Sequence, residues 1–343
     1  SGSGPRSAAR RMPGTVRIHE VESPLLRGNP LGDPHVRRVP VYLPPGHDEA
    51  AERRYPVLFA LAGFTGTGRS YLGFDWWQPD LPTQLDRLIV EGMDPVVVVM
   101  VDGMTRLGGN QYVDSTAVGP WARHVTEELV PWAERELPVL PGRDHRGVFG
   151  KSSGGYGSLM MGLEHADVFA GVACHSGDCY FEYCYGPDFP KAVDGLASVG
   201  GLGAFLEGLR RHAWPKFPSR LFPALNITAM THFYSPNPDA EHGVDLPFDE
   251  GTGERRPEVL ARWARRDPVE LVAEHADDLR SLRHLWIECG TRDEYNLHHG
   301  ARILSGRLRD LGVDHVHDEF DDDHRSLSYR YDVSLPPLAR ALA

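Results

Sequence analysis

Cysteine is scarce in this chain, with four residues in 343. Three of them, Cys174, Cys179 and Cys184, are spaced five residues apart, unlike the CxxC pairs that are typical of zinc sites. Together with Cys289 they are expected to be buried free thiols rather than parts of a metal site or a disulfide framework. This low cysteine usage favours a cytoplasmic location.

Long hydrophobic runs are also missing. The longest, such as residues 95–101 (PVVVVMV), are far too short to cross a bilayer, and we predict no membrane span. Residues 1–14 (SGSGPRSAARRMPG) lack the apolar core of a secretory signal. They are expected to be a disordered tail or a cloning remnant. This interpretation leaves open whether a leader peptide was removed earlier.

Positive charge is in deficit. Lysine and arginine number 36 against 48 aspartates and glutamates, which gives a net charge of −12. Such a chain lacks the basic surface of a nucleic-acid binder, and that class is excluded. Glycine (37 residues) and proline (28 residues) are in excess, which indicates many turns or long irregular segments. The length suits either two domains or one large α/β domain, with no metal or disulfide needed for stability.

Short β-rich runs alternate with amphipathic stretches, which indicates a mostly parallel sheet flanked by helices. Two of the runs are continuously apolar, as expected for central strands that are covered on both faces. A short loop joins the first two predicted strands of the chain, and we therefore expect these two strands to form an antiparallel hairpin. The predicted strands are Thr15–Glu22, Val36–Leu43, Val57–Ala62, Val96–Val101, Arg146–Phe149, Phe169–Cys174, Leu285–Cys289 and His315–Phe320. The predicted helices are Leu81–Gly92, Trp121–Leu137 with a kink at Pro131, a helix after Gly154, and Asn296–Leu311.

Residues 178–257 show no strand-like alternation and are rich in aromatic and turn residues. Loops of this length are uncommon in compact domains and are usually functional where they occur. Because the predicted strands resume at Leu285, we interpret this segment as a cap inserted into one catalytic domain that spans residues 15–343. Its aromatic residues favour a bulky apolar or aromatic acyl group, or they serve only to pack the cap; they are Tyr180, Phe181, Tyr183, Tyr185, Trp214, Phe217 and Phe233.

The most specific local motif is Gly150–Gly154 (GKSSG), which matches G-x-S-x-G. A predicted strand precedes it and a helical pattern follows it, which is the context of a nucleophile elbow. Small neighbours let the backbone pass closely around a strained serine. The motif assigns the nucleophile to Ser152 rather than to Ser153.

A nucleophilic serine needs a base, and the base needs an orienting carboxylate. In this architecture the chain order is serine, acid, histidine, with the last two at the ends of later strands. Asp293 follows one such strand and His324 follows the last, so we predict them as acid and base. Glu294 remains an alternative for the acid. The alternatives for the base are His175, His298, His299, His315 and His317. The turn before His324, formed by Asp321, Asp322 and Asp323, can also be interpreted as a solvated acidic turn.

The loop after the third predicted strand, residues 62–68 (AGFTGTG), is rich in glycine. It contains neither G-x-x-x-x-G-K-[ST] nor G-x-G-x-x-G, which argues against a nucleotide site. We expect it to supply one backbone N–H of an oxyanion hole, from Phe64, while Ser153 supplies the other.

Together the segments ALAGFTGTG, GGNQYVDSTAVGPW, RGVFGKSSGGYG, ECGTRD and FDDDH resemble the α/β-hydrolase fold "putative esterase" family. That family includes S-formylglutathione hydrolase, feruloyl and enterochelin esterases and mycolyltransferases. The resemblance runs from about Val36 to the C-terminus, outside most of residues 178–257. It implies the same triad and oxyanion donors, and it brings the loop 110–115 to the substrate. Lys151 is an unusual neighbour of the nucleophile, and the family often has methionine at the position of Ser153.

The expected function is that of a serine hydrolase that cleaves a carboxylic ester or thioester through an acyl-enzyme, without cofactor or metal. Its expected partner is a small-molecule substrate, and the sequence is compatible with a homo-oligomer. The alternatives are an acyltransferase with the same triad, a non-catalytic binding protein, and a metal-dependent enzyme. The residues expected to contact substrate are Gly63, Thr65, Asn110, Tyr112, Lys151, Asp178, Tyr180 and Phe181.

Overall fold

The computed structural model describes residues 13–48 and 51–343. Most of the predicted tail, residues 1–12, lies outside the described part of the chain. The eight predicted strands form one sheet in the order β1-β2-β4-β3-β7-β8-β9-β10. The strands are β1 (Thr15–Glu22), β2 (Val36–Leu43), β3 (Val57–Leu61), β4 (Val97–Val101), β7 (Arg146–Lys151), β8 (Gly171–His175), β9 (His284–Gly290) and β10 (Val316–Phe320).

Six of these strands, from β4 across to β10, run parallel, while β2 is antiparallel to both β1 and β4. The strands β3 and β4 are buried along their whole length, because helices cover both faces of the sheet. The parallel order brings the C-terminal ends of β3, β7, β8, β9 and β10 to one edge. That edge is where a ligand site is expected in an open α/β sheet.

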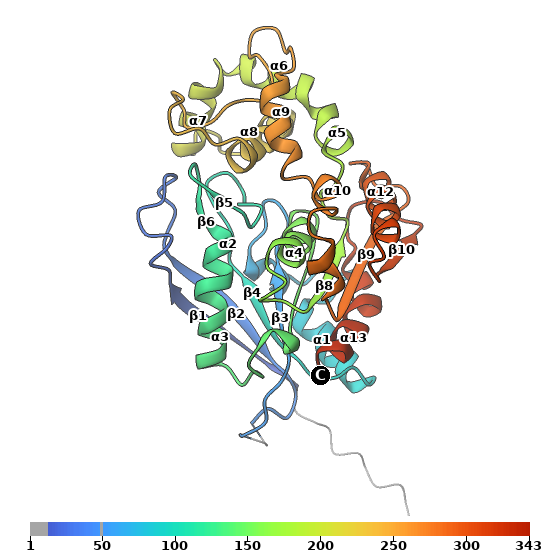
Figure 1. Cartoon of the computed structure of the whole chain (residues 1–343). Helices are drawn as coiled ribbons and strands as arrows, with labels where there is room; N and C mark the ends of the chain where they lie inside the picture. The colour runs from blue at the N-terminus through green and yellow to red at the C-terminus, as the bar shows by residue number, and fades with distance from the viewer. Residues whose placement is uncertain (1–12, 49–50) are drawn as a thin grey trace, which may run out of the picture.

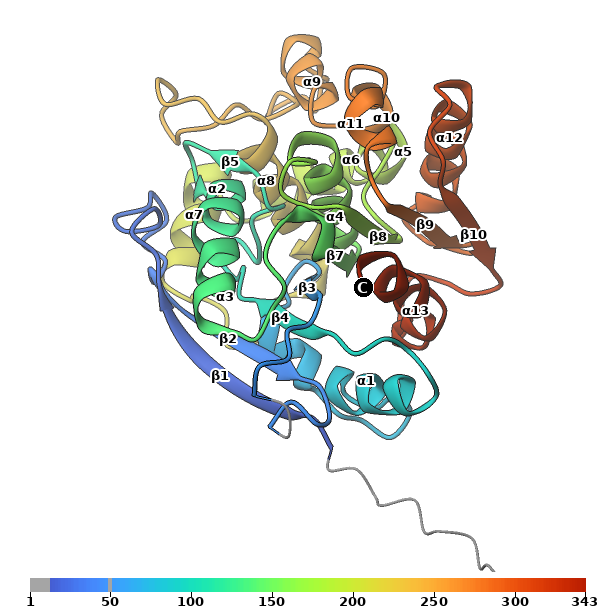
Figure 2. The same cartoon turned by 60° about the horizontal axis from the view of Figure 1, so that its bottom comes forward.

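Helices flank both faces of the sheet (Figure 2), and a hydrophobic core lies on each face. One core packs the sheet against α1 (Leu81–Val90) and α13 (Tyr331–Leu342). The other packs it against α2 (Trp121–Arg123), α3 (Val130–Glu136), α4 (Ser153–Glu164) and α12 (Leu297–Asp310). A small hairpin of β5 (Asp114–Ser115) and β6 (Gly119–Pro120) precedes α2.

The helix predicted over Trp121–Leu137 was expected to kink at Pro131, but the structure interrupts it before that proline. A π-helical segment, His124–Leu129, lies between α2 and α3, ahead of Pro131. Here the backbone N–H of Val130 donates to the carbonyl of Val125, five residues back. Proline lacks the N–H that an α-helix needs at this position, and the wider turn accommodates its ring.

The segment between β8 and β9 is largely helical, which corrects the expectation of turn-rich, irregular sequence over 178–257. It contains α5 (Phe181–Cys184), α6 (Phe189–Ser198), α7 (Leu202–Arg210), α8 (Phe222–Tyr234), α9 (Pro257–Ala264), α10 (Pro268–Leu271) and α11 (Ala276–Arg280). Helices α5–α9 lie beyond the edge of the sheet (Figure 1). The periodicity of α8 escapes a sequence pattern because nearly all of its residues are buried, so it has no polar face.

All four cysteines are buried free thiols, as predicted. Burial raises the pKa of each thiol and keeps it protonated. Within the described ranges, no single helix is long and apolar enough to cross a membrane, although the bent pair Phe181–Ser198 and Leu202–Arg210 passes that test jointly.

Candidate active site

Ser152 lies in the sharp turn between β7 and α4. Its backbone adopts φ 59° and ψ −119°, a conformation that residues with a side chain rarely occupy. The backbone N–H of Ser152 donates to the carbonyl of His175 at 2.9 Å, which ties the turn to the end of β8. The strained turn presents the hydroxyl at the C-terminal edge of the sheet, as the elbow motif predicts.

The glycines of the motif are required by close packing. A Cβ atom on Gly150 or on Gly154 would overlap the carbonyl oxygen of Leu61 on β3. A Cβ on Gly155 would meet the carbonyl oxygen of His175 at 2.6 Å. Helix α4 therefore begins in direct contact with two strands, and only glycine permits this approach.

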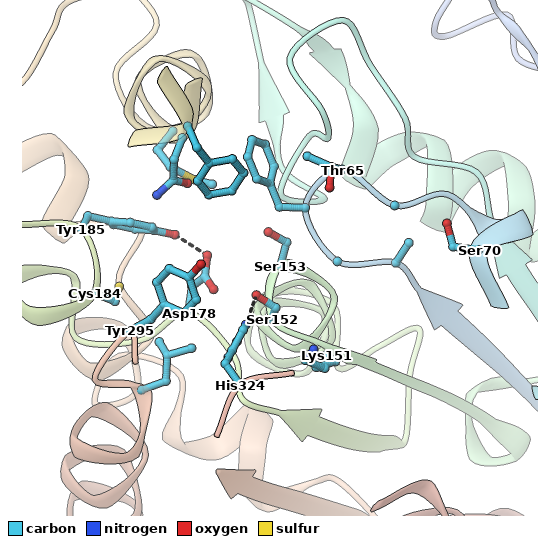
Figure 3. A pocket seen from close by; sticks show the side chains of 18 of the residues that line it. Thr65, Ser70, Lys151, Ser152, Ser153, Asp178, Cys184, Tyr185, Tyr295 and His324 are labelled. Atoms are coloured by element: carbon cyan, nitrogen blue, oxygen red, sulfur yellow. Dashed lines mark hydrogen bonds between the residues drawn. The ribbon is translucent and has the colours of Figure 1, made fainter. Parts of the chain in front are cut away.

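The side chains of Ser152, His324 and Asp293 form a continuous hydrogen-bonded chain. His324 Nε2 lies 3.0 Å from Ser152 Oγ (Figure 3). On the other side of the ring, His324 Nδ1 lies 2.6 Å from Asp293 Oδ2. The three residues follow β7, β10 and β9, so the parallel sheet brings together groups that are far apart in sequence. This geometry suits a nucleophile, a base and an orienting acid.

The environment of Asp293 favours its ionised form. Burial alone would raise the pKa of this carboxyl, but the hydrogen bond and charge of His324 outweigh burial. The backbone N–H groups of Tyr295 and Leu297 also donate to Asp293 Oδ1, at 2.9 and 3.4 Å. The pKa of Asp293 therefore lies below its usual value, and the carboxylate is available to accept from His324.

The structure gives the competing residues other positions. Glu294 Oε2 accepts from the backbone N–H of His324 at 3.0 Å and does not bond the imidazole. His175 lies beneath the elbow, between Glu288 and Ser334. None of the competing histidines lines the cavity beside Ser152, which leaves His324 as the imidazole at that hydroxyl. The other four competitors lie on α12 (His298 and His299), just before β10 (His315) and on β10 itself (His317).

A cavity of about 420 Å³ opens beside Ser152. Phe64 and Ser153 both line this cavity, and no acceptor within the described residues receives the backbone N–H of either residue. The loop that carries Phe64 passes close to the elbow, since a Cβ on Gly63 would lie 3.3 Å from the carbonyl oxygen of Lys151. Two backbone donors beside the nucleophile are what an oxyanion hole requires.

Four of the residues predicted to contact substrate line the cavity: Gly63, Thr65, Lys151 and Asp178. Burial lowers the pKa of Lys151, and the nearby carboxylates of Asp293, Asp323 and Glu294 oppose that effect. Burial also disfavours the charged form of Asp178 and therefore raises the pKa of its carboxyl group. Asp178 lies across the cavity from Ser152 (Figure 3).

The other four predictions of substrate contact are corrected, because those residues do not line the cavity. Asn110 donates to the carbonyl of Gly103 at 2.8 Å, and Tyr112 donates from its hydroxyl to the carbonyl of Ala62 at 2.8 Å. These two residues support the loops from behind. The backbone N–H groups of Tyr180 and Phe181 donate to the carboxylate of Asp267, and both residues line a second cavity that does not contain Ser152.

Sequence reasoning missed most of the cavity wall. The ring of Tyr295 packs edge-on against His324, with 4.8 Å between ring centroids, and its position two residues after the acid was an available signal. Helix α8 contributes Phe222, Asn226 and Met230 to the wall, and no local pattern marks them. Of the seven cap aromatics named above, Tyr185 is the one that lines the cavity; Tyr183 is exposed, and the other five belong to the hydrophobic core or pack against it. Among the described residues, no group of three or more His, Cys, Asp or Glu side chains is arranged to hold a metal ion.

The sheet order, the elbow and the hydrogen-bonded Ser-His-Asp chain define the α/β-hydrolase class, and similar solved structures share this fold. A ferulic acid esterase superposes with a TM-score of 0.61 at 18% identity, over 96% of this chain and 98% of its own. An S-formylglutathione hydrolase from Agrobacterium tumefaciens gives a TM-score of 0.57 at 18% identity, over 96% and 95%. The family described as "Putative esterase" matches residues 34–329. The chain belongs to this family, which confirms the predicted family and fold.

Curated relatives match over shorter stretches. The esterase Rv1288 of Mycobacterium tuberculosis is 32% identical over 127 residues, which is 36% of this chain and 26% of the relative. The S-formylglutathione hydrolase of Mus musculus is 26% identical over 162 residues, covering 41% of this chain and 52% of the relative. The chain thus matches about a quarter to a half of the length of these relatives.

Proposed function

We propose that this protein is a serine esterase that cleaves a carboxylic ester or thioester through an acyl-enzyme. One observation carries the proposal: the His324 imidazole bonds Ser152 Oγ with one nitrogen and the buried Asp293 carboxylate with the other. Membership of the esterase family supports the same activity. The relatives named as S-formylglutathione hydrolase and ferulic acid esterase support a thioester or an ester as the substrate class.

In the proposed first step, Ser152 Oγ attacks the substrate carbonyl carbon while His324 Nε2 takes the hydroxyl proton. Asp293 holds the imidazole in the required tautomer and stabilises its protonated form. The tetrahedral oxyanion accepts from the backbone N–H groups of Phe64 and Ser153, and each such donor lowers the barrier by about 3 kcal/mol. His324 then protonates the departing alcohol or thiol. A water molecule, activated by the same imidazole, hydrolyses the acyl-enzyme and releases the acid.

The position of α8 supports a cap role for residues 178–257 in this reaction. Phe222, Asn226 and Met230 face the same cavity as Ser152, as does Tyr185 from the segment between α5 and α6. We propose that these residues surround the part of the substrate that enters the cavity. Enclosure by protein limits access of bulk water to the reacting carbonyl.

A panel of p-nitrophenyl esters, assayed with the wild type and with Ser152→Ala, tests the activity. The wild type is expected to hydrolyse at least one ester, and the variant is expected to lose at least about 10³-fold in kcat. A fluorophosphonate probe followed by peptide mass spectrometry should label Ser152 in the folded wild type. Absence of both labelling and turnover would exclude nucleophilic catalysis. An added alcohol acceptor measures transfer, and transfer far above hydrolysis would replace the hydrolase assignment by an acyltransferase.

A further inference from the structure

The carboxyl group of Asp178 faces the cavity opposite Ser152 and Ser153 (Figure 3). Asp178 is 7% exposed, so its carboxyl group has little contact with bulk water. Asp178 follows β8 through a turn in which Ser176 adopts a left-handed φ of 46°. That turn carries the chain from the sheet into the inserted segment and directs Asp178 to the site.

Two donors fix the Asp178 carboxylate. Tyr185 donates from its hydroxyl to Asp178 Oδ2 at 2.5 Å, and Gln111 donates from Nε2 to the same oxygen at 3.1 Å. Gln111 is itself held in a left-handed conformation, with φ 53°, and donates to the Tyr234 hydroxyl at 2.8 Å. Within the described residues no hydrogen bond reaches Asp178 Oδ1. A rigidly held acceptor oxygen is therefore available to a ligand in the cavity.

No Arg, Lys or His side chain of the described residues lies within ion-pair distance of Asp178, and the nearest titratable cation that acts on its pKa is the imidazole of His324 in the same cavity. Lys151 also lines the cavity, but the carboxylates that act on its pKa are Asp293, Asp323 and Glu294. A buried carboxylate without a cation is unfavourable unless a ligand supplies one. Aromatic side chains form much of the remaining wall, and their ring faces attract cations; they include Phe64, Phe222, Tyr185 and Tyr295.

We propose that Asp178 is a specificity-determining residue, and that its Oδ1 accepts a hydrogen bond from an ammonium group on the substrate. This inference rests on the proposed esterase function and narrows it to esters or thioesters that carry a cationic amine. A hydroxyl could also donate to Oδ1, but only a cation would offset the cost of keeping the buried carboxylate in its charged form. The unpaired charge and the aromatic wall favour the cation.

The test compares two p-nitrophenyl ester series with acyl chains of six to eight carbons. In one series the chain ends in an ammonium group, and in the other it ends in a methyl group. At its best chain length, the wild type should prefer the ammonium ester in kcat/KM by about 10- to 100-fold, the range expected of a charge-assisted hydrogen bond. Asp178→Asn should abolish this preference. The matched control Asp33→Asn removes a half-buried carboxylate that does not line the cavity, and it should retain the preference.

A second measurement needs no variant. Hexylammonium should inhibit wild-type hydrolysis of the methyl-ended ester at least about 10-fold more strongly than hexan-1-ol, which has a similar shape but no charge. Equal inhibition, or equal kcat/KM for the two ester series, would overturn the proposal. A failure of the esterase function is distinguishable, since the methyl-ended esters would then not be cleaved in a Ser152-dependent way.

Discussion

The backbone N–H of Ser152 donates to the backbone carbonyl of His175 across 2.9 Å, so the nucleophile is held by the last residue of β8. The side chain of His175 is in turn fixed from both sides. Its Nδ1 lies 3.3 Å from Glu288 Oε2, and its Nε2 lies 2.8 Å from Ser334 Oγ on α13. The position of the elbow therefore depends on a buried polar network beneath it.

Glu288 is the centre of that network. Its side chain is fully buried and also accepts from Trp286 Nε1 at 3.1 Å and from Arg330 Nε at 3.2 Å. Burial would raise the pKa of Glu288, but His175 and Arg330 outweigh burial and lower it. The carboxylate is thus ionised and connects β8, β9 and the start of α13.

Replacing this carboxylate by an amide should destabilise the fold. In Glu288→Gln the guanidinium of Arg330 loses its fully buried partner and keeps the partly exposed Asp318, and we expect the free energy of unfolding to fall by about 2 kcal/mol. Urea unfolding at neutral pH measures the change. Glu258→Gln, which removes an exposed partner of Arg256, is the control and should leave the unfolding midpoint unchanged. Equal midpoints for wild type and Glu288→Gln would contradict a structural role of the network.

Asp293 and Glu294 are adjacent carboxylates that the sequence alone could not separate. We expect Asp293→Asn to lower kcat by about 10³- to 10⁴-fold, because the amide no longer stabilises the protonated imidazole of His324. Glu294→Gln retains an oxygen that can accept from the backbone N–H of His324, so kcat should fall less than about tenfold. Steady-state kinetics on one activated ester compares the two variants. Similar losses in both would show that the acid is wrongly assigned.

The sheet was predictable to within two residues at every strand end, because the central strands read as short apolar runs between turn signals. The G-x-S-x-G motif and the chain order predicted that Ser152, Asp293 and His324 lie together, and the structure joins their side chains by hydrogen bonds because the ends of parallel strands meet at one edge. These predictions depend on local pattern and on topology. Both properties can be read directly from the sequence.

The cavity wall was not predictable in the same way. Phe222 and Met230 reach the site because of the way α8 packs against α6 and β5, and that arrangement depends on long-range contacts. Tyr180 and Phe181 look equivalent to Tyr185 in the sequence CYFEYCYG, yet only Tyr185 faces the cavity. The backbone of the first two residues is held by Asp267, which is more than 80 positions away and cannot be linked to them from the sequence.

Gly154 and Gly306 both lie in helices but face different surroundings. A Cβ on Gly154 would overlap the backbone of Leu61, so we expect Gly154→Ala to lower the free energy of unfolding by about 3 kcal/mol and to abolish activity. Around Gly306 on α12 the nearest atom is a guanidinium nitrogen of Arg309 at 3.9 Å. Gly306→Ala should therefore stabilise by about 0.5 to 1 kcal/mol, through helix propensity alone. Thermal unfolding of the two variants checks both signs, and equal effects would contradict the close packing at the elbow.

Asp267 anchors the start of the inserted segment and gives it a pH dependence. Its carboxylate accepts from the backbone N–H groups of Phe181 at 2.7 Å, Tyr180 at 3.0 Å and Val269 at 3.2 Å. Burial raises its pKa to about 6, and these hydrogen bonds offset only part of that effect. An unfolded chain ionises the same group near its ordinary value of 3.8.

Between about pH 4 and pH 6 the folded protein therefore keeps the Asp267 proton while the unfolded chain has lost it. The folded state binds more protons in this window, so the contribution of Asp267 to the free energy of unfolding falls as the pH rises, by about 3 kcal/mol in total. Other carboxylates titrate over the same range. Subtracting the urea-unfolding curves of Asp267→Asn from those of the wild type at pH 4, 5, 6 and 7 isolates this contribution. The difference should decrease up to about pH 6 and then level off, and parallel curves at all four values would refute the raised pKa.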